Sequence, residues 1–106
     1  NFTIMKEEPF GPLVPILTFK TFDEVIERAN DNDLGLCSYL YTNSMDKAHI
    51  GSEKLESGCV AVNTGVVAIA EAPFGGIKQT GYGREGGSGA IKDYLNVKYT
   101  HMGLKI

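Results

Sequence analysis

The apolar residues of this 106-residue chain follow the period of a helix in some segments and the period of a strand in others. A first helix is predicted to begin after Thr21, because Thr21 and Glu24 have the spacing of a capping box. Its apolar residues recur at intervals of three and four and therefore share one face: Phe22, Val25, Ile26 and Ala29. Residues 30–35 are expected to end this helix.

A second helix is predicted from Ser44 to about Glu56, with Ser44 as its cap and Gly58 just beyond as the stop. Three apolar runs are interpreted as strands, at residues 13–19, 36–42 and 59–63. The order strand, helix, strand, helix, strand predicts an α/β fold, in which helices pack on a sheet.

Two further elements are predicted toward the C-terminal end. A glycine-rich run precedes a short helix at residues 90–95, and a helix with such a start needs neighbours to hold it. Residues 97–102 then alternate like a strand, with no later segment of the chain to pair with. Because an unpaired edge promotes association, we expect this strand to pair with another subunit.

Residues 63–85 follow the third predicted strand and have neither period, so they predict a long loop of the kind that serves a site. The loop contains Gly81, Gly83 and Gly86 at the spacing G-x-G-x-x-G, which holds a pyrophosphate in a strand–loop–helix unit. Here a loop precedes the glycines, and too little chain follows to complete such a unit. We therefore interpret them as a turn that passes close to neighbouring backbone.

The charge and composition argue against several classes of partner. The formal net charge is −3 with both signs interspersed, so neither nucleic acid nor a membrane surface is a predicted partner. The sequence has no apolar run of membrane-spanning length and no signal-peptide pattern, so we expect a cytoplasmic protein. Cys37 and Cys59 lie in predicted strands and are interpreted as structural, and the separation of His49 and His101 predicts no metal site.

Residues 7–12, with the sequence EEPFGP, are a second candidate for function. Adjacent acids commonly face solvent, but these precede Phe10, which stands between two prolines and a glycine in a rigid corner that can present a side chain. The run APFGG around Phe74 also has two interpretations, a turn with a packed ring or part of a site.

Four segments in this order resemble one family. EEPFGP, NTG at 63–65, PFGGIKQTGYGREGG at 73–87 and DYLNVKY at 93–99 are similar to the C-terminal part of an aldehyde dehydrogenase, and to its succinate-semialdehyde dehydrogenase branch in particular. The resemblance implies that residues 1–94 are the C-terminal part of the catalytic domain. It also implies that residues 95–106 are an oligomerisation strand and tail, in a homodimer or homotetramer.

The resemblance implies an enzyme that oxidises an aldehyde to the carboxylic acid with NAD or NADP, using a cysteine thiolate and a glutamate-activated water. In the family these two groups and the cofactor domain lie upstream of EEPFGP. No catalytic residue is therefore expected in this chain, and the isolated chain is expected to be inactive. A stand-alone binding module or a structural and interaction domain are the alternatives, but the sequence predicts neither closed sheet edges nor a pocket of its own.

The resemblance assigns auxiliary roles to particular residues. Glu8 matches the glutamate that accepts hydrogen bonds from the hydroxyls of the nicotinamide ribose, and Phe10 matches the aromatic residue that lies against the nicotinamide. Phe74 matches the aromatic residue that lines the substrate tunnel, and residues 64–72 match the wall that selects the aldehyde.

One position departs from the family pattern. In the succinate-semialdehyde branch a serine shortly after NTG helps to hold the substrate carboxylate, whereas this chain has Val66, Val67 and Ala68 there. Loss of one hydroxyl donor is expected to weaken carboxylate binding by about 1.5–3 kcal/mol. Ala68 thus leaves open whether the substrate is succinate semialdehyde or a related aldehyde, such as 2-oxoglutarate semialdehyde.

Overall fold

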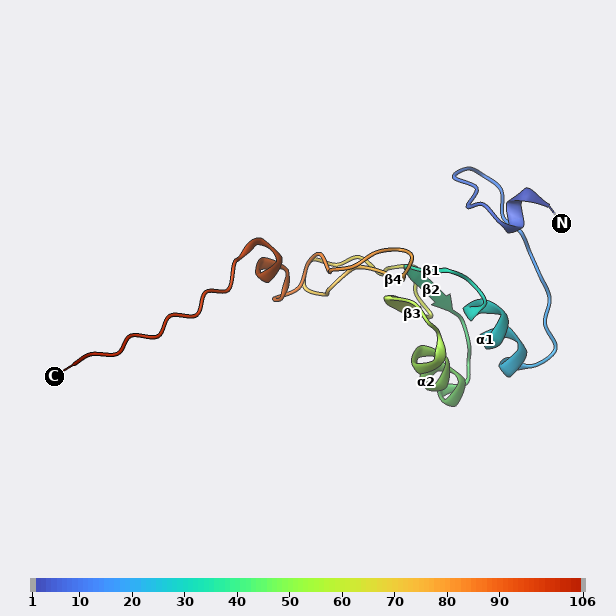
Figure 1. Ribbon diagram of the computed structural model, residues 1–106. Coiled ribbons are helices and arrows are strands. Elements are labelled where there is room, and N and C mark those ends of the chain that lie inside the picture. Colours follow the sequence, from blue (N-terminus) through green and yellow to red (C-terminus); the bar gives the residue numbers. More distant parts are fainter. Residues whose placement is uncertain (1, 106) are drawn as a thin grey trace.

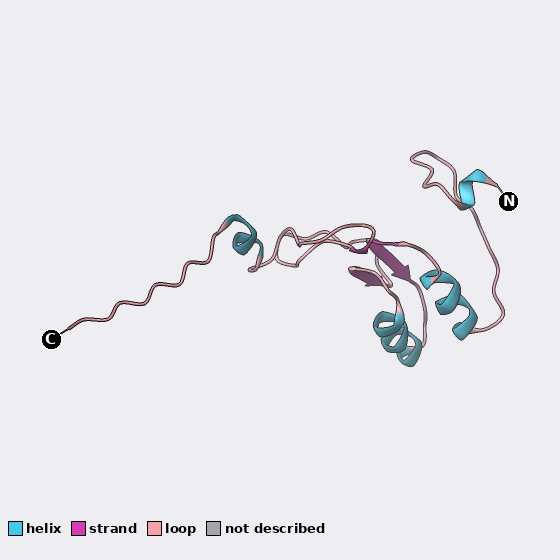
Figure 2. Cartoon of the chain, in the orientation of Figure 1, coloured by secondary structure: helices cyan, strands magenta, loops and turns pink. Residues whose placement is uncertain are grey.

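The middle of the chain forms a small α/β body from which both ends extend (Figure 1). The structure is a computed structural model that describes residues 2–105. In Figure 2 the helices, strands and loops are distinguished by colour. The elements are η1 (Thr3–Met5), α1 (Phe22–Asn30), β1 (Leu34–Gly35), β2 (Cys37–Leu40), α2 (Met45–Lys54), β3 (Cys59–Val62), β4 (Ile77–Lys78) and η2 (Ala90–Tyr94).

Helix α1 begins where the capping box predicts. The side chain of Thr21 accepts a hydrogen bond from the backbone N–H of Glu24, and the Glu24 carboxylate accepts one from the backbone N–H of Lys20. This second bond, assisted by the Arg28 side chain, lowers the pKa of the Glu24 carboxyl below its ordinary value. The helix buries Ile26 in the core, as the apolar spacing predicts.

Helix α2 crosses from β2 to β3 and packs on both strands. Ser44 caps it by accepting a hydrogen bond from the backbone N–H of Lys47, which confirms the predicted start. Gly51 of α2 is buried against Leu40 of β2. A Cβ at this position would lie 2.5 Å from a methyl carbon of Leu40, which is too close for a side chain. The absence of a side chain there lets the helix approach the sheet closely.

The strands form two separate pairs. β2 and β3 are parallel, with Cys37 opposite Cys59 and Leu40 opposite Val62, and α2 is the crossover between them. β1 and β4 are antiparallel, with Gly35 opposite Ile77. β4 lies within the segment predicted to be an unbroken loop, so that prediction was wrong at these two residues.

Two other predicted strands differ from the structure. Residues 13–19 and 97–102 are extended but belong to no strand among the described residues, and the side chains of Val14 and Val97 are exposed. A strand requires a neighbour to receive its backbone hydrogen bonds, and neither segment has one within residues 2–105. The mixed α/β character is confirmed by the elements of the body. The prediction of a strand at 13–19 is wrong, and the segment 97–102 has no pairing partner among residues 2–105.

The core of the body is small. Ile26 and Ala61 are the buried apolar residues among those described, and both lie where the helices meet the β2–β3 pair. Many large apolar side chains remain exposed, and the molecule measures 75 × 34 × 24 Å. The N-terminal segment and the C-terminal tail extend in different directions from the body (Figure 1).

Candidate functional site

The N-terminal segment presents the first pair of predicted site residues. Glu8 and Phe10 follow η1 on a stretch without regular structure, and the Phe10 ring is 96% exposed. Glu8 lies at the border of a cleft of about 730 Å³ between this segment and the body, with Gly35 and Cys37 on the opposite side. Among the described residues the Glu8 carboxylate makes no ion pair.

The second pair lies on the loop between β3 and β4. Ala68 is exposed, and Phe74 is half-buried. The backbone of Phe74 is fixed, because Phe74 and Glu85 exchange two hydrogen bonds of 2.7 and 2.8 Å. The Phe74 side chain borders a cleft of about 550 Å³ together with Arg84 and Tyr94.

The two pairs do not meet in this structure. Glu8 and Phe10 belong to the N-terminal segment, while residues 63–85 extend from the other side of the body (Figure 1). Ala68 and Phe74 share the loop but border no common cleft. The predicted residues therefore lie on two separate surfaces of the chain.

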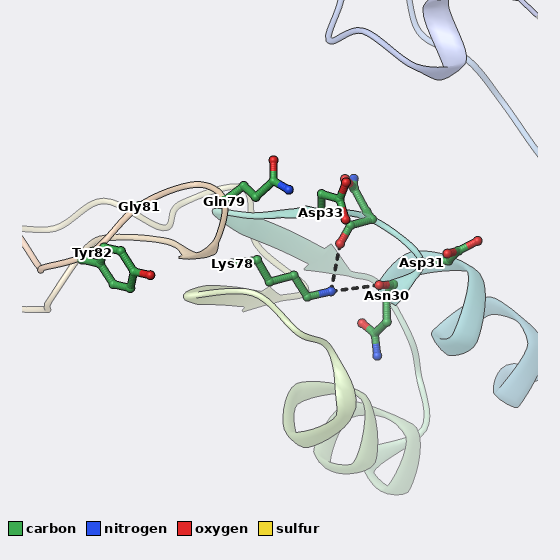
Figure 3. Close-up of a pocket in the computed structure, with 8 residues that line it drawn as sticks. Asn30, Asp31, Asp33, Lys78, Gln79, Gly81 and Tyr82 are labelled. Atoms are coloured by element: carbon green, nitrogen blue, oxygen red, sulfur yellow. Dashed lines mark hydrogen bonds between the residues drawn. The ribbon is translucent and has the colours of Figure 1, made fainter.

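The loop starts and ends at residues that the sequence reasoning did not select. Asn63, at the start, forms a pair of hydrogen bonds with the backbone of Thr42. Lys78, at the end, places its ammonium against the C-terminal end of α1 (Figure 3). The NTG and GGIKQTG segments contain these residues, but the sequence gives no sign of which distant backbone atoms they bind.

The glycine-rich run forms a turn, as interpreted from the sequence. Gly81, Gly83 and Gly86 have φ angles of +117°, +88° and +67°, which favour glycine over all other residues. A Cβ on Gly86 would lie 2.8 Å from the carbonyl oxygen of Ala72, so the two backbones touch. Arg84 donates to the carbonyl oxygen of Gly83 within this turn and to that of Gly76, which lies just before β4.

The two cysteines have the surroundings of structural residues. Cys37 and Cys59 are half-buried free thiols on neighbouring strands. Burial and the adjacent Cys59 raise the pKa of the Cys37 thiol, whereas a nucleophilic cysteine needs a lowered pKa. Within residues 2–105 no group of three or more potential metal ligands comes together. In the same range no helix has the length and apolar character needed to cross a membrane.

These features define an α/β segment in which Glu8 and Phe74 each border an open cleft, while the Phe10 ring is exposed. The chain belongs to the aldehyde dehydrogenase family, whose model matches residues 1–100.

The named relatives that the chain resembles are several times longer than the chain itself. It is 46% identical over 104 residues to the succinate-semialdehyde dehydrogenase (NADP+) GabD of Escherichia coli, covering 98% of this chain and 22% of that protein. It is 46% identical to the glutarate-semialdehyde dehydrogenase of Pseudomonas aeruginosa, covering 97% of this chain and 21% of the relative. An aldehyde dehydrogenase of Bacillus cereus, solved as an NAD+ complex, superposes with a TM-score of 0.88 at 46% identity, over 92% of this chain and 20% of that one. The chain thus spans about a fifth of the length of the relatives it matches.

Proposed function

We propose that this chain supplies cofactor-facing and substrate-facing loops to an NAD(P)-dependent aldehyde dehydrogenase that oxidises succinate semialdehyde or a related semialdehyde. The family match over residues 1–100 carries the proposal. It is supported by relatives named for succinate and glutarate semialdehydes, whose substrates share a carboxylate distant from the aldehyde.

On this proposal, Glu8 and Phe10 face the nicotinamide end of the cofactor. An ionised carboxylate is an acceptor only and can take two hydroxyl donors at once, which suits a ribose. The exposed Glu8 carboxylate and the 96% exposed Phe10 ring are both available for such contacts, so the residues fit the group. Glu8 and Phe10 would hold and orient the nicotinamide, whose chemistry when bound would be that of a hydride acceptor.

Ala68 and Phe74 form the substrate-facing wall in the proposal. Phe74, fixed through Glu85, would shield the reacting end of the aldehyde from water. Ala68 stands on the exposed part of the loop, where the side chain can reach the tail of the substrate but offers no hydroxyl. This combination favours binding of the tail largely by shape, with the carboxylate held by groups elsewhere in the enzyme.

The remaining parts of the proposal concern assembly. Residues 1–94, as the C-terminal part of the catalytic domain, would pack through their exposed apolar side chains against the part of the enzyme that lies upstream. Residues 95–106 would pair with a second subunit, giving a homodimer or homotetramer, since Val97 is fully exposed. The isolated 106-residue chain would be inactive, because neither of its thiols has the surroundings of a nucleophile.

The test uses the parent enzyme, which is the full-length aldehyde dehydrogenase of which this chain is proposed to be a part, and two matched variants. The parent should reduce NAD or NADP in the presence of succinate semialdehyde or glutarate semialdehyde, measured by absorbance of the reduced cofactor. Glu8→Gln should raise the cofactor KM by about tenfold or more, because it replaces charge-assisted hydrogen bonds with neutral ones. Glu7→Gln, at the adjacent exposed acid, is the control and should leave the cofactor KM unchanged. Equal effects of the two variants would refute the role of Glu8, and aldehyde oxidation by the isolated chain would refute its inactivity.

A further inference from the structure

Two non-glycine residues hold a left-handed backbone conformation. Among residues 2–105, Asn63 and Lys78 are the non-glycine residues with positive φ, and both have φ of +55°. This conformation costs about 1–2 kcal/mol for a residue such as Lys, whereas Asn adopts it more readily, and it persists where surrounding contacts determine it. Asn63 and Lys78 directly flank residues 64–77, the segment that contains Ala68 and Phe74.

Asn63 is held at the end of the β2–β3 pair. Its Oδ1 accepts a hydrogen bond of 2.9 Å from the backbone N–H of Thr42, and its Nδ2 donates one of 3.0 Å to the Thr42 carbonyl. Its own backbone N–H donates to the carbonyl of Leu40 at 2.8 Å. The amide therefore continues the β2–β3 ladder by one step, and fixes the direction in which the loop leaves.

Lys78 is held by two backbone carbonyls and one carboxylate. Its Nζ donates to the carbonyl oxygens of Asn30 at 2.9 Å and Asn32 at 3.0 Å (Figure 3), and lies 2.6 Å from Oε2 of Glu56. An ammonium has three donors, and this one has three partners. Asn30 is the last residue of α1, where the helix dipole favours a cation.

The partners of Lys78 are themselves connected. The side chain of Asn30 donates to the carbonyl of Lys54 at 2.8 Å and accepts from the backbone N–H of Glu56 at 2.9 Å. The ends of α1 and α2 are thereby joined through one amide, and Lys78 binds both sides of that junction. The end of the loop is thus tied to the two helices of the body, while its start is tied to the sheet.

We propose that Asn63 and Lys78 are positioning residues that set substrate specificity by clamping residues 64–77 at both ends. They act through the backbone and do not touch the aldehyde. With both ends fixed, the wall bearing Ala68 and Phe74 keeps one distance from the reacting centre, and that distance selects the length of the aldehyde tail. The inference rests on the proposed function, because it assigns the loop to the substrate.

The test compares Lys78→Met and Asn63→Ala in the parent enzyme with Lys54→Met as the control. Lys54 is an exposed lysine whose nearest carboxylate, that of Asp23, lies 3.8 Å away. A misplacement of about 1 Å costs about 100-fold in rate, so kcat/KM for succinate semialdehyde should fall by about 10- to 100-fold. Propanal has no carboxylate and makes little contact with the wall, so its kcat/KM should fall less. The fold loss for propanal should be at most about one fifth of the fold loss for succinate semialdehyde, a difference of the size expected from one lost contact. Lys54→Met should leave both values at the wild-type level.

Hydrogen exchange supplies a readout that does not depend on activity. Peptides within residues 64–74 should exchange faster in both clamp variants, whereas peptides from α1 should keep their wild-type rates. Lys78→Gly separates the clamp from backbone strain, because glycine accepts the positive φ but has no ammonium. It should behave like Lys78→Met.

Three outcomes would overturn the proposal. These are equal losses of kcat/KM for the two aldehydes, unchanged exchange in residues 64–74, or a Lys78→Gly variant that behaves like the wild type. If the parent oxidises neither semialdehyde, the proposed function fails. The exchange measurement then still decides whether Asn63 and Lys78 clamp the loop.

Discussion

Substitution of Gly58 tests how closely the backbone of residues 75–76 packs against the body. Gly58 lies between α2 and β3, and its backbone N–H donates to the carbonyl of Gly35 at 3.0 Å. A Cβ at this position would lie 1.8 Å from the carbonyl oxygen of Gly75 and 2.9 Å from the Cα of Gly76. Gly58→Ala must therefore push away the backbone that directly follows Phe74.

The size of the effect follows from these distances. Non-bonded heavy atoms pack at about 3.5 Å, so a carbonyl oxygen that would lie 1.8 Å from the added Cβ must move by about 1.7 Å. The obstructing atoms belong to backbone, which cannot rotate aside as a side chain can. Overpacking of this kind typically costs about 1–3 kcal/mol in the free energy of unfolding. Because Gly75 adjoins Phe74, the substrate wall should be displaced as well.

The assay is urea unfolding of the parent enzyme together with steady-state kinetics. Gly58→Ala should lower the unfolding midpoint by an amount equivalent to about 1–3 kcal/mol, and should reduce kcat/KM for the semialdehyde by about tenfold or more. Gly89→Ala is the matched control, because a Cβ there meets no atom within 4 Å and φ is −85°. A Gly58→Ala enzyme as stable and active as Gly89→Ala would refute the close approach on which the reasoning depends.

Three further predictions concern other parts of the chain. Ala68→Ser should lower the KM of the parent for succinate semialdehyde, by about tenfold if one charge-assisted hydrogen bond is gained; an unchanged KM would remove the reason to doubt this substrate. Thr21→Ala should destabilise the fold by about 1 kcal/mol through loss of the α1 cap, with Ser88→Ala at an exposed position as a silent control; equal unfolding midpoints would contradict it. Because the pKa of Cys37 is raised in the folded state, the folded chain keeps a thiol proton at alkaline pH that the unfolded chain loses. The contribution of the Cys37 thiol to the free energy of unfolding is therefore complete below the ordinary pKa of 9.0 and declines as the pH rises above it. Cys37→Ala should flatten that alkaline decline in unfolding experiments, and a decline of the same size would show that another group causes it.

The sequence predicts best where local chemistry decides the structure. Thr21 and Ser44 each cap a helix with their own side chain within three residues, so the starts of α1 and α2 were predicted correctly. The strand–helix–strand order of β2, α2 and β3 was also predicted from periodicity, and the structure adds that the two strands pair in parallel.

The predictions failed where structure depends on distant partners. Residues 13–19 have the composition of a strand, but no neighbouring strand of the described chain receives their hydrogen bonds. β4 is two residues long and exists because β1 lies beside it, so no periodicity could reveal it. Asn63 and Lys78 bind backbone atoms 21 and 48 residues away, respectively, and the sequence does not show which atoms those are.

The small core has a consequence for how tolerance to mutation should be measured in this chain. A mutational scan of the chain alone would score Ile26 and Ala61 as sensitive to substitution, because they are the buried apolar residues among those described. It would score the exposed Phe10 and Tyr99 as neutral. In the assembled enzyme of our proposal, Phe10 faces the cofactor and Tyr99 faces another subunit, so both would become sensitive. The positions whose rank changes between the two scans would then map the surfaces along which this segment meets the rest of the protein.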